Sequence, residues 1–268
     1  GPVPANLTPG LTASSDDRPA VYDDGCHLEP GPVAPEGPCV YGDPTGARTI
    51  VLFGDSHAAQ WFPALELIAE ERGARLVSWT KSSCAVSVVG LYNEVLKRGY
   101  RECDQWRERI LSAIADLRPD LVVTASADTD SARPFGTGDP DRAWTDGWVE
   151  AYGRIAASGA DVVHIADTPW PPDGDVPDCL AAHLHDAGSC AADEAGTLKH
   201  PARRAATTAA LAEAGATVID PTPWVCAPGG RCPVVVGNLL VYRDAHHMTT
   251  VWAQLLAGVL GRGLAGAG

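Results

Sequence analysis

Short apolar runs typical of β-strands alternate with helical patterns along most of this chain of 268 residues. The β-type runs cover residues 48–53, 75–80, 121–125, 161–166 and 216–220. The helical patterns cover residues 58–72, 100–117, 145–158 and 201–214, and a last helix is expected to begin near Thr249. Strands that alternate with helices of this length form a mostly parallel sheet with helices on both faces. We therefore predict an α/β fold, a three-layer sandwich.

The segments outside this alternation are rich in Pro, Gly and polar residues. Residues 1–46 lack periodicity and are predicted to be an N-terminal arm, so that residues 47–268 form a single domain. We expect a polar loop over residues 128–144 and a long insertion between the fourth strand and about residue 200, which its two cysteines would keep ordered. Gly237-Asn238 between apolar residues predicts a hairpin over residues 234–242.

The chain contains eight cysteines, which fall in four sequential pairs that each enclose a short loop. The pairs are Cys26–Cys39, Cys84–Cys103, Cys179–Cys190 and Cys226–Cys232. Eight cysteines allow 105 connectivities, so the sequence alone does not determine the pairing, and we predict nearest-neighbour disulfides. The alternative is a zinc site that also uses His183 and His185, although no Cys-x-x-Cys pair supports it. Disulfides indicate an oxidising compartment outside the cytoplasm.

The formal net charge of −14 argues against two classes of partner. Binding of DNA or RNA depends on clustered Lys and Arg side chains, so no nucleic-acid partner is expected. An anionic membrane surface is disfavoured for the same reason. A membrane-spanning helix needs a run of about 18 apolar residues, and the sequence contains no such run.

Ser56 lies where the first predicted strand ends, within the sequence Gly54-Asp55-Ser56-His57. Active sites of open α/β sheets lie at the carboxyl ends of the strands. The helix that follows would direct its free N–H groups at an acyl oxyanion bound there. The alternative interpretation is that Ser56 caps this helix, as serine often does.

A serine nucleophile needs an adjacent base, and the best candidate precedes the last helix. Asp244 and His247 have the spacing Asp-x-x-His, which allows the carboxylate to orient the imidazole through one ring N–H. A pairing of Asp244 with His246 is an alternative. Taken alone, the same spacing also fits a capped helix start with two surface histidines.

Together these motifs resemble the SGNH (GDSL-like) hydrolase superfamily, and more narrowly the SGNH domains fused to membrane acyltransferase family 3. The resemblance extends from Gly25-Cys26-His27 to the last helix. Its main segments are residues 53–61 (FGDSHAAQW), 80–84 (TKSSC), 103–106 (CDQW), 232–233 (CP) and 242–249 (YRDAHHMT). The resemblance implies a flavodoxin-like, SGNH-hydrolase-like fold. It also implies that Ser56 is the nucleophile, His247 the base and Asp244 the residue that orients His247.

The resemblance further implies an activity and a location. Such domains accept an acyl group, acetyl or succinyl, which a membrane acyltransferase domain of the same polypeptide delivers. They pass it through a serine acyl-enzyme to hydroxyls of a cell-envelope or secreted glycan. The chain would then be extracytoplasmic and tethered to the membrane, with no cofactor and no metal.

Two features of the superfamily are missing from the sequence. The superfamily has a glycine after the second strand and an asparagine after the third, and both feed the oxyanion hole. Here these stretches contain Lys81-Ser82-Ser83-Cys84 and Thr124-Ala125-Ser126-Ala127. We therefore expect the backbone N–H of Ser56 to donate, with Ser82, Ser83 or Ser126 as further candidates. Lys81 is a candidate for holding an anionic acyl group; the alternative is a solvated loop lysine.

Three other functions fit parts of the pattern. Gly-Asp-x-His also occurs in metal-dependent phosphoesterases, but the strand ends offer Asp128, Asp130 and Asp167 without the further Asn-His pair that such a site needs. A non-catalytic glycan-binding module on the same scaffold would not need a complete triad. A carbohydrate O-acyl esterase differs from a transferase only in that water attacks the acyl-enzyme.

Overall fold

Five parallel strands form the centre of the protein in a computed structural model that describes residues 1–171 and 174–266. They are β3 (Thr49–Gly54), β4 (Arg75–Lys81), β7 (Leu121–Ala125), β9 (Asp161–Ile165) and β11 (Thr217–Ile219). Their order across the sheet is β4-β3-β7-β9-β11. This is the flavodoxin-like order, in which the connections change direction between β3 and β7. The predicted fold class and the predicted strands are therefore confirmed.

Two short strands from the first 46 residues join the same sheet. β1 (His27–Leu28) pairs parallel with the carboxyl end of β4, and β2 (Val40–Gly42) pairs antiparallel with its beginning. The disulfide between Cys26 and Cys39 links the residues that precede these two strands. Part of the segment predicted as an arm thus extends the edge of the sheet.

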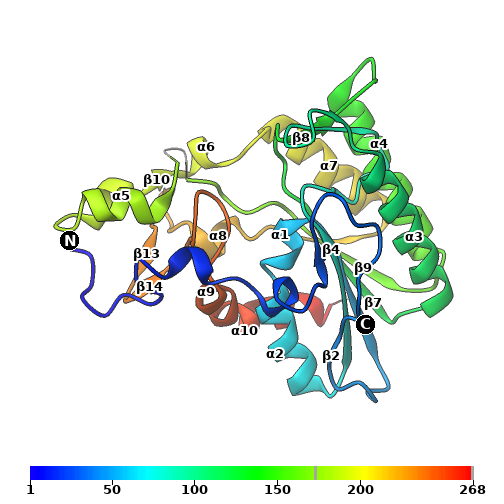
Figure 1. The fold of residues 1–268 in the computed structure, drawn as a ribbon, viewed down its shortest axis with the longest axis horizontal. Helices are drawn as coiled ribbons and strands as arrows, with labels where there is room; N and C mark the ends of the chain where they lie inside the picture. The colour runs from blue at the N-terminus through cyan, green and yellow to red at the C-terminus, as the bar shows by residue number, and fades with distance from the viewer. Residues whose placement is uncertain (172–173, 267–268) are drawn as a thin grey trace.

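Helices cover both faces of the sheet (Figure 1). One face packs against α2 (Phe62–Arg72), α9 (Thr250–Leu255) and α10 (Ala257–Leu264), and the other against α3 (Arg101–Leu117), α4 (Pro140–Ala156) and α7 (Pro201–Ala214). Successive strand residues point to opposite faces, so Leu52 lies in the first core and Phe53 in the second. Both side chains are fully buried.

Two predicted segments differ from the structure. The helix predicted over residues 58–72 is divided into α1 (Ser56–Ala59) and α2. The polar loop predicted over 128–144 contains β8 (Ala132–Pro134), which pairs with β5 (Leu91–Asn93), and β5 in turn pairs with β6 (Arg98–Gly99). Helix α4 begins at Pro140 because the side chain of Asp139 caps it by accepting the N–H of Arg142.

The insertion after β9 is ordered in its described part and lies at one end of the molecule (Figure 1). It contains α5 (Val176–Ala182), η3 (Ala187–Cys190), β10 (Ala192–Asp193) and α6 (Glu194–Thr197). The remaining short elements are η1 (Ser14–Asp16), η2 (Ala20–Tyr22), α8 (Thr222–Val225), β12 (Arg231–Cys232), β13 (Val235–Val236) and β14 (Leu239–Leu240).

All four predicted disulfides are present, and each joins nearest neighbours along the chain. They are Cys26–Cys39, Cys84–Cys103, Cys179–Cys190 and Cys226–Cys232. The third bridge takes up both sulfur atoms that the alternative zinc site would use. Among the described residues, no helix combines the length and apolar character that a membrane crossing requires.

Candidate active site

The turn that follows β3 is held by a glycine and a buried carboxylate. A Cβ atom on Gly54 would lie 1.9 Å from the carbonyl oxygen of Ala125, so only glycine permits this approach of β3 to β7. Asp55 caps α1 with Oδ1, which accepts the N–H of His57 at 2.8 Å. Its other oxygen accepts the N–H of Ala127 at 2.9 Å. Because Asp55 caps the helix, the Ser56 hydroxyl is available for another contact.

That contact joins Ser56 to the two residues predicted as its triad partners. The Ser56 Oγ lies 2.9 Å from Nε2 of His247, and Nδ1 of His247 lies 2.7 Å from Oδ2 of Asp244. The other oxygen of Asp244 accepts the backbone N–H groups of His246 and His247 at 2.9 and 2.8 Å. The structure thus brings the three residues of the predicted triad into contact, although Ser56 and His247 are 191 positions apart in the sequence.

The protonation states suit a base at His247. Burial lowers the pKa of His247 to about 4, although the hydrogen bond to Asp244 acts in the opposite direction. Burial would raise the pKa of Asp244, but the hydrogen bond and charge of His247 outweigh it and hold the pKa well below its usual range. At neutral pH, Asp244 is therefore ionised, and neutral His247 donates from Nδ1 to it. Its Nε2 lone pair can then accept the Ser56 proton.

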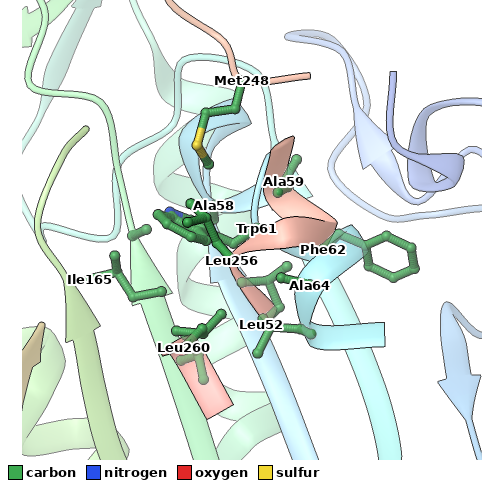
Figure 2. Packing of buried hydrophobic residues seen from close by; sticks show 14 of the residues in the cluster. Leu52, Ala58, Ala59, Trp61, Phe62, Ala64, Ile165, Met248, Leu256 and Leu260 are labelled. Carbon is green, nitrogen blue, oxygen red and sulfur yellow. The ribbon is translucent and has the colours of Figure 1, made fainter. Parts of the chain in front are cut away.

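The loop that carries Asp244 and His247 is fixed at both ends. Its backbone closes on itself where the Arg243 N–H donates to the carbonyl of His247 at 2.9 Å. The side-chain oxygen of Gln60 accepts the N–H of Met248 at 2.9 Å. Figure 2 shows the Met248 side chain pointing toward Ala58 of α1, within the core that lies beneath the site. The segment that bears His247 is therefore anchored to Gln60, which follows the helix that begins at Ser56.

A second chain of hydrogen bonds lies directly beside the first. His57 Nδ1 lies 2.5 Å from Oδ1 of Asp167, the second residue after β9, and His57 Nε2 lies 2.9 Å from Nδ1 of His246. The rings of His57 and His246 stack with Trp170, with centroids 4.9 and 4.1 Å from that of the indole. The His246 ring thus pairs with His57, while only the backbone N–H of His246 contacts Asp244.

Sequence reasoning missed this second chain. His57 entered only as part of a motif, and Asp167 only as a metal ligand for the phosphoesterase alternative. The signal that was available is positional, because polar residues directly after neighbouring parallel strands meet at one edge of the sheet.

Both chains open on a cleft of about 340 Å³. Its lining includes Tyr22, Ser56, Ser83, Trp170, Arg243 and His246. Arg243 is buried, and its Nε lies 3.7 Å from Oδ2 of Asp244. The cleft therefore places a cationic side chain beside the triad carboxylate.

The predicted oxyanion donors occupy different positions. Ser82 and Ser83 line the cleft, and the Ser82 hydroxyl is 3.0 Å from Nε2 of His27. The Ser126 hydroxyl accepts the N–H of Val86 at 3.1 Å, and Ser126 is not among the described residues that line the cleft. The backbone N–H of Ser56 belongs to the first residue of α1.

Lys81 lies elsewhere. Its ammonium group donates to the carbonyls of Glu29, Pro30 and Pro32 at 2.8, 2.9 and 2.6 Å. The side chain is fully buried, and burial lowers its pKa to about 8. Lys81 thus ties down the loop between β1 and β2, a role that neither the anion-binding nor the solvated-lysine interpretation anticipated.

Comparison with known proteins identifies the family and the fold. A family model described as "SGNH domain (fused to AT3 domains)" matches residues 25–262, where AT3 denotes acyltransferase family 3. The periplasmic domain of a lipopolysaccharide acetyltransferase from Salmonella ser. Paratyphi A is similar, with a TM-score of 0.65 and 15% identity over 84% of this chain and 86% of that one. A GDSL-like lipase from Bacteroides thetaiotaomicron has a TM-score of 0.51 and 13% identity, covering 82% of this chain and 89% of the lipase.

No curated protein sequence matches the chain. The structural neighbours share its fold, and the family model covers most of its length. This chain therefore belongs to the family of SGNH domains that are fused to AT3 domains.

Proposed function

We propose that this domain transfers an acyl group, acetyl or succinyl, through an acyl-enzyme on Ser56 to hydroxyl groups of a cell-envelope or secreted glycan. Membership of the family makes it an acyl-transferring or esterase enzyme. The observation that carries the proposal is the unbroken chain of hydrogen bonds from Ser56 through His247 to Asp244, which opens on the cleft.

In the first half-reaction, Ser56 Oγ attacks the carbonyl carbon of the acyl donor while His247 Nε2 takes the hydroxyl proton. Collapse of the tetrahedral intermediate breaks the bond to the leaving group, which receives that proton from His247. In the second half-reaction, His247 takes the proton of an acceptor hydroxyl as its oxygen attacks the acyl-enzyme, and then returns the proton to Ser56. Asp244 stabilises the imidazolium that forms in each half.

The origin of the acyl group and the acceptor are inferred from the family. Fusion to AT3 domains supports a membrane acyltransferase domain of the same polypeptide as the source of the acyl group. A neighbour that is the periplasmic domain of a lipopolysaccharide acetyltransferase supports a glycan acceptor and an extracytoplasmic, membrane-tethered location. Four disulfides fit an oxidising compartment.

The nucleophile is tested by labelling the domain with a fluorophosphonate and locating the adduct by mass spectrometry. We expect labelling of Ser56 in the wild type and in Ser189→Ala, an exposed serine in the insertion, and none in Ser56→Ala. A protein that binds glycans but is not labelled would instead be the non-catalytic binding module.

Transfer is separated from hydrolysis by supplying the domain with an aryl acetate or an aryl hemisuccinate together with candidate oligosaccharides. We expect acylated sugar, detected by mass spectrometry, in excess of free acid. Free acid alone, at every acceptor concentration, would identify the domain as a carbohydrate O-acyl esterase.

A further inference from the structure

The second chain of hydrogen bonds runs from Asp167 through His57 to His246, which lies at the cleft. The hydrogen-bond donors around Asp167 determine which ring nitrogen of His246 carries a proton. The carboxylate of Asp167 accepts the backbone N–H groups of Asp128 and Thr168 at 3.0 and 2.9 Å, and the indole N–H of Trp170 at 2.8 Å. A carboxyl group surrounded by donors is ionised, because each donor stabilises the charged form. Nδ1 of His57, 2.5 Å away, must therefore carry a proton.

The carboxylates around His57 favour a proton on its second nitrogen as well. Burial lowers the pKa of His57, but the negative charge of Asp167 and the hydrogen bond to it outweigh burial, and Asp55 and Asp244 add to the effect, so the net shift is upward. Burial and the charges of His57 and His247 lower the pKa of His246 to about 2, so His246 is the neutral ring of the pair. His57 is then an imidazolium that donates from Nε2 to Nδ1 of His246.

This arrangement fixes the tautomer of His246. Because Nδ1 accepts a hydrogen bond, the single proton of the neutral ring is on Nε2. The ring stacks on Trp170, and the indole N–H is itself bound to Asp167, so the stack and the hydrogen bond to His57 together hold the orientation of the ring. No described residue forms a hydrogen bond with Nε2 of His246, and His246 lines the catalytic cleft.

Acyl transfer on Ser56 requires such a donor. The attack of Ser56 places a negative charge on the former carbonyl oxygen, and fixed N–H groups beside it are a large source of catalysis. The Ser126 hydroxyl is held by Val86, and the Ser82 hydroxyl lies in contact with His27. An imidazole whose tautomer is fixed with the proton on Nε2 meets this requirement. It presents no lone pair at that position and so does not compete with His247 as a base.

We propose that Nε2–H of His246 donates a hydrogen bond to the acyl oxyanion, and that the His57–Asp167 pair acts by positioning this donor. The proposal rests on the proposed acyl-transfer function for the identity of the oxyanion. The two adjacent histidines then have complementary roles: His247 presents a lone pair to Ser56, and His246 presents an N–H to the substrate.

The tautomer is measured directly in the resting domain by long-range proton–nitrogen NMR of the imidazole rings. At pH 7, we expect His246 to be protonated at Nε2 only and His57 at both nitrogens. A proton on Nδ1 of His246 would overturn the proposal. The spectra can also be recorded on Ser56→Ala, so this result is independent of whether the triad performs acyl transfer.

The donor is tested by two substitutions of His246, assayed by hydrolysis of 4-nitrophenyl acetate. His246→Leu removes the N–H and should lower kcat about 100-fold with little change in KM, the usual effect of losing one oxyanion donor. His246→Gln places an amide N–H near the position of Nε2 and should stay within about tenfold of the wild type. Equal losses in both variants, or no loss in either, would contradict the proposal.

The positioning role of His57 is tested by the same NMR measurement. In His57→Gln, the amide N–H can still donate to Nδ1 of His246, so the Nε2-protonated tautomer should persist. In His57→Leu, no donor remains, and His246 should become a mixture of tautomers. An unchanged tautomer in His57→Leu would remove His57 from the proposal, even if that variant were less stable.

Discussion

Two chains of hydrogen bonds lead away from the same cleft, and each contains a histidine that faces a carboxylate. His57 and Asp167 have side chains only 1% and 6% exposed, whereas those of His247 and Asp244 are 14% and 33% exposed. Yet the pKa of the more deeply buried His57 is raised and that of His247 is lowered. Burial alone would give the opposite order.

The difference lies in the charges around each ring. Burial opposes protonation of both rings, but His57 is close to the carboxylates of Asp167, Asp55 and Asp244, which favour its imidazolium. His247 has Asp244 as its partner but also faces the positive charges of His57 and Arg243. The centroids of the His57 and His247 rings are 5.1 Å apart. Burial, together with the charges of His57 and Arg243, thus keeps His247 neutral and able to accept a proton.

The largest expected loss of activity comes from substitutions in the hydrogen-bond chain that ends at Ser56. Ser56→Ala and His247→Ala should each lower kcat for an aryl acetate by about 10⁵-fold or more, because nucleophile and base act as one unit. Ser189→Ala is the matched control and should keep the wild-type rate. Wild-type rates in both triad variants would show that the hydrogen-bonded residues Ser56, His247 and Asp244 do not perform the reaction.

The two carboxylates should respond differently to the same change. Asp244→Asn should lower kcat by about 10⁴-fold, since the base loses its orienting charge. Asp167→Asn should lower kcat far less, by at most about 100-fold through the loss of the positioned His246 donor. It should also lower the free energy of unfolding by about 3 kcal/mol, because it leaves the buried His57 without its charge partner. Denaturant titration and aryl acetate kinetics on both variants measure these effects. A larger loss of kcat in Asp167→Asn than in Asp244→Asn would mean that the hydrogen-bond chain through His57 and Asp167 contains the catalytic base.

The pH dependence of kcat/KM tests the electrostatic link between the chains. Because His247 must be neutral to accept a proton, activity should fall only as the pH drops through about 4. In His57→Gln, the positive charge is gone, so the pKa of His247 rises and the acid limb should move from about 4 toward 6.5. An acid limb near 6.5 in the wild type would show that burial and the charge of His57 do not lower the pKa of His247.

The smallest effect is expected at a serine that belongs to neither chain. Ser126→Ala should change kcat by less than about threefold and lower the free energy of unfolding by about 1 kcal/mol, because the N–H of Val86 loses its partner. Thermal unfolding and aryl acetate kinetics measure both quantities. A loss near 100-fold would return Ser126 to the oxyanion hole.

The parallel sheet was accessible from the sequence pattern, and the contact between Ser56 and His247 was implied by the resemblance to SGNH hydrolases. Each strand is a compact apolar run, and the carboxyl-end rule assigns Ser56 to the active edge whatever the details of packing. The Asp-x-x-His spacing is local and allowed Asp244 to pair with His247, and the resemblance favoured this pairing over the alternative with His246. These features depend on neighbours in sequence, on one general rule of topology, or on motifs that the chain shares with the superfamily.

The remaining features depend on contacts that sequence patterns do not encode. His57 and Asp167 are 110 residues apart, and no periodicity links them. Lys81 lies at the end of β4, where its exposure depends on the loop between β1 and β2 that folds over it. The sequence does not reveal the division between α1 and α2, because the apolar stripe continues through Trp61, a buried residue that lies at the break itself.

The side chain of Gln60 has a consequence for how this edge of the sheet moves. Its oxygen holds the N–H of Met248, and its nitrogen donates to the hydroxyl of Thr168 at 3.1 Å, so one amide spans the segments that bear His247 and Asp167. Movement of either segment away from Gln60 would break a buried hydrogen bond to this amide. Solvent exchange of the Met248 amide proton therefore reports local opening of the segment that bears His247.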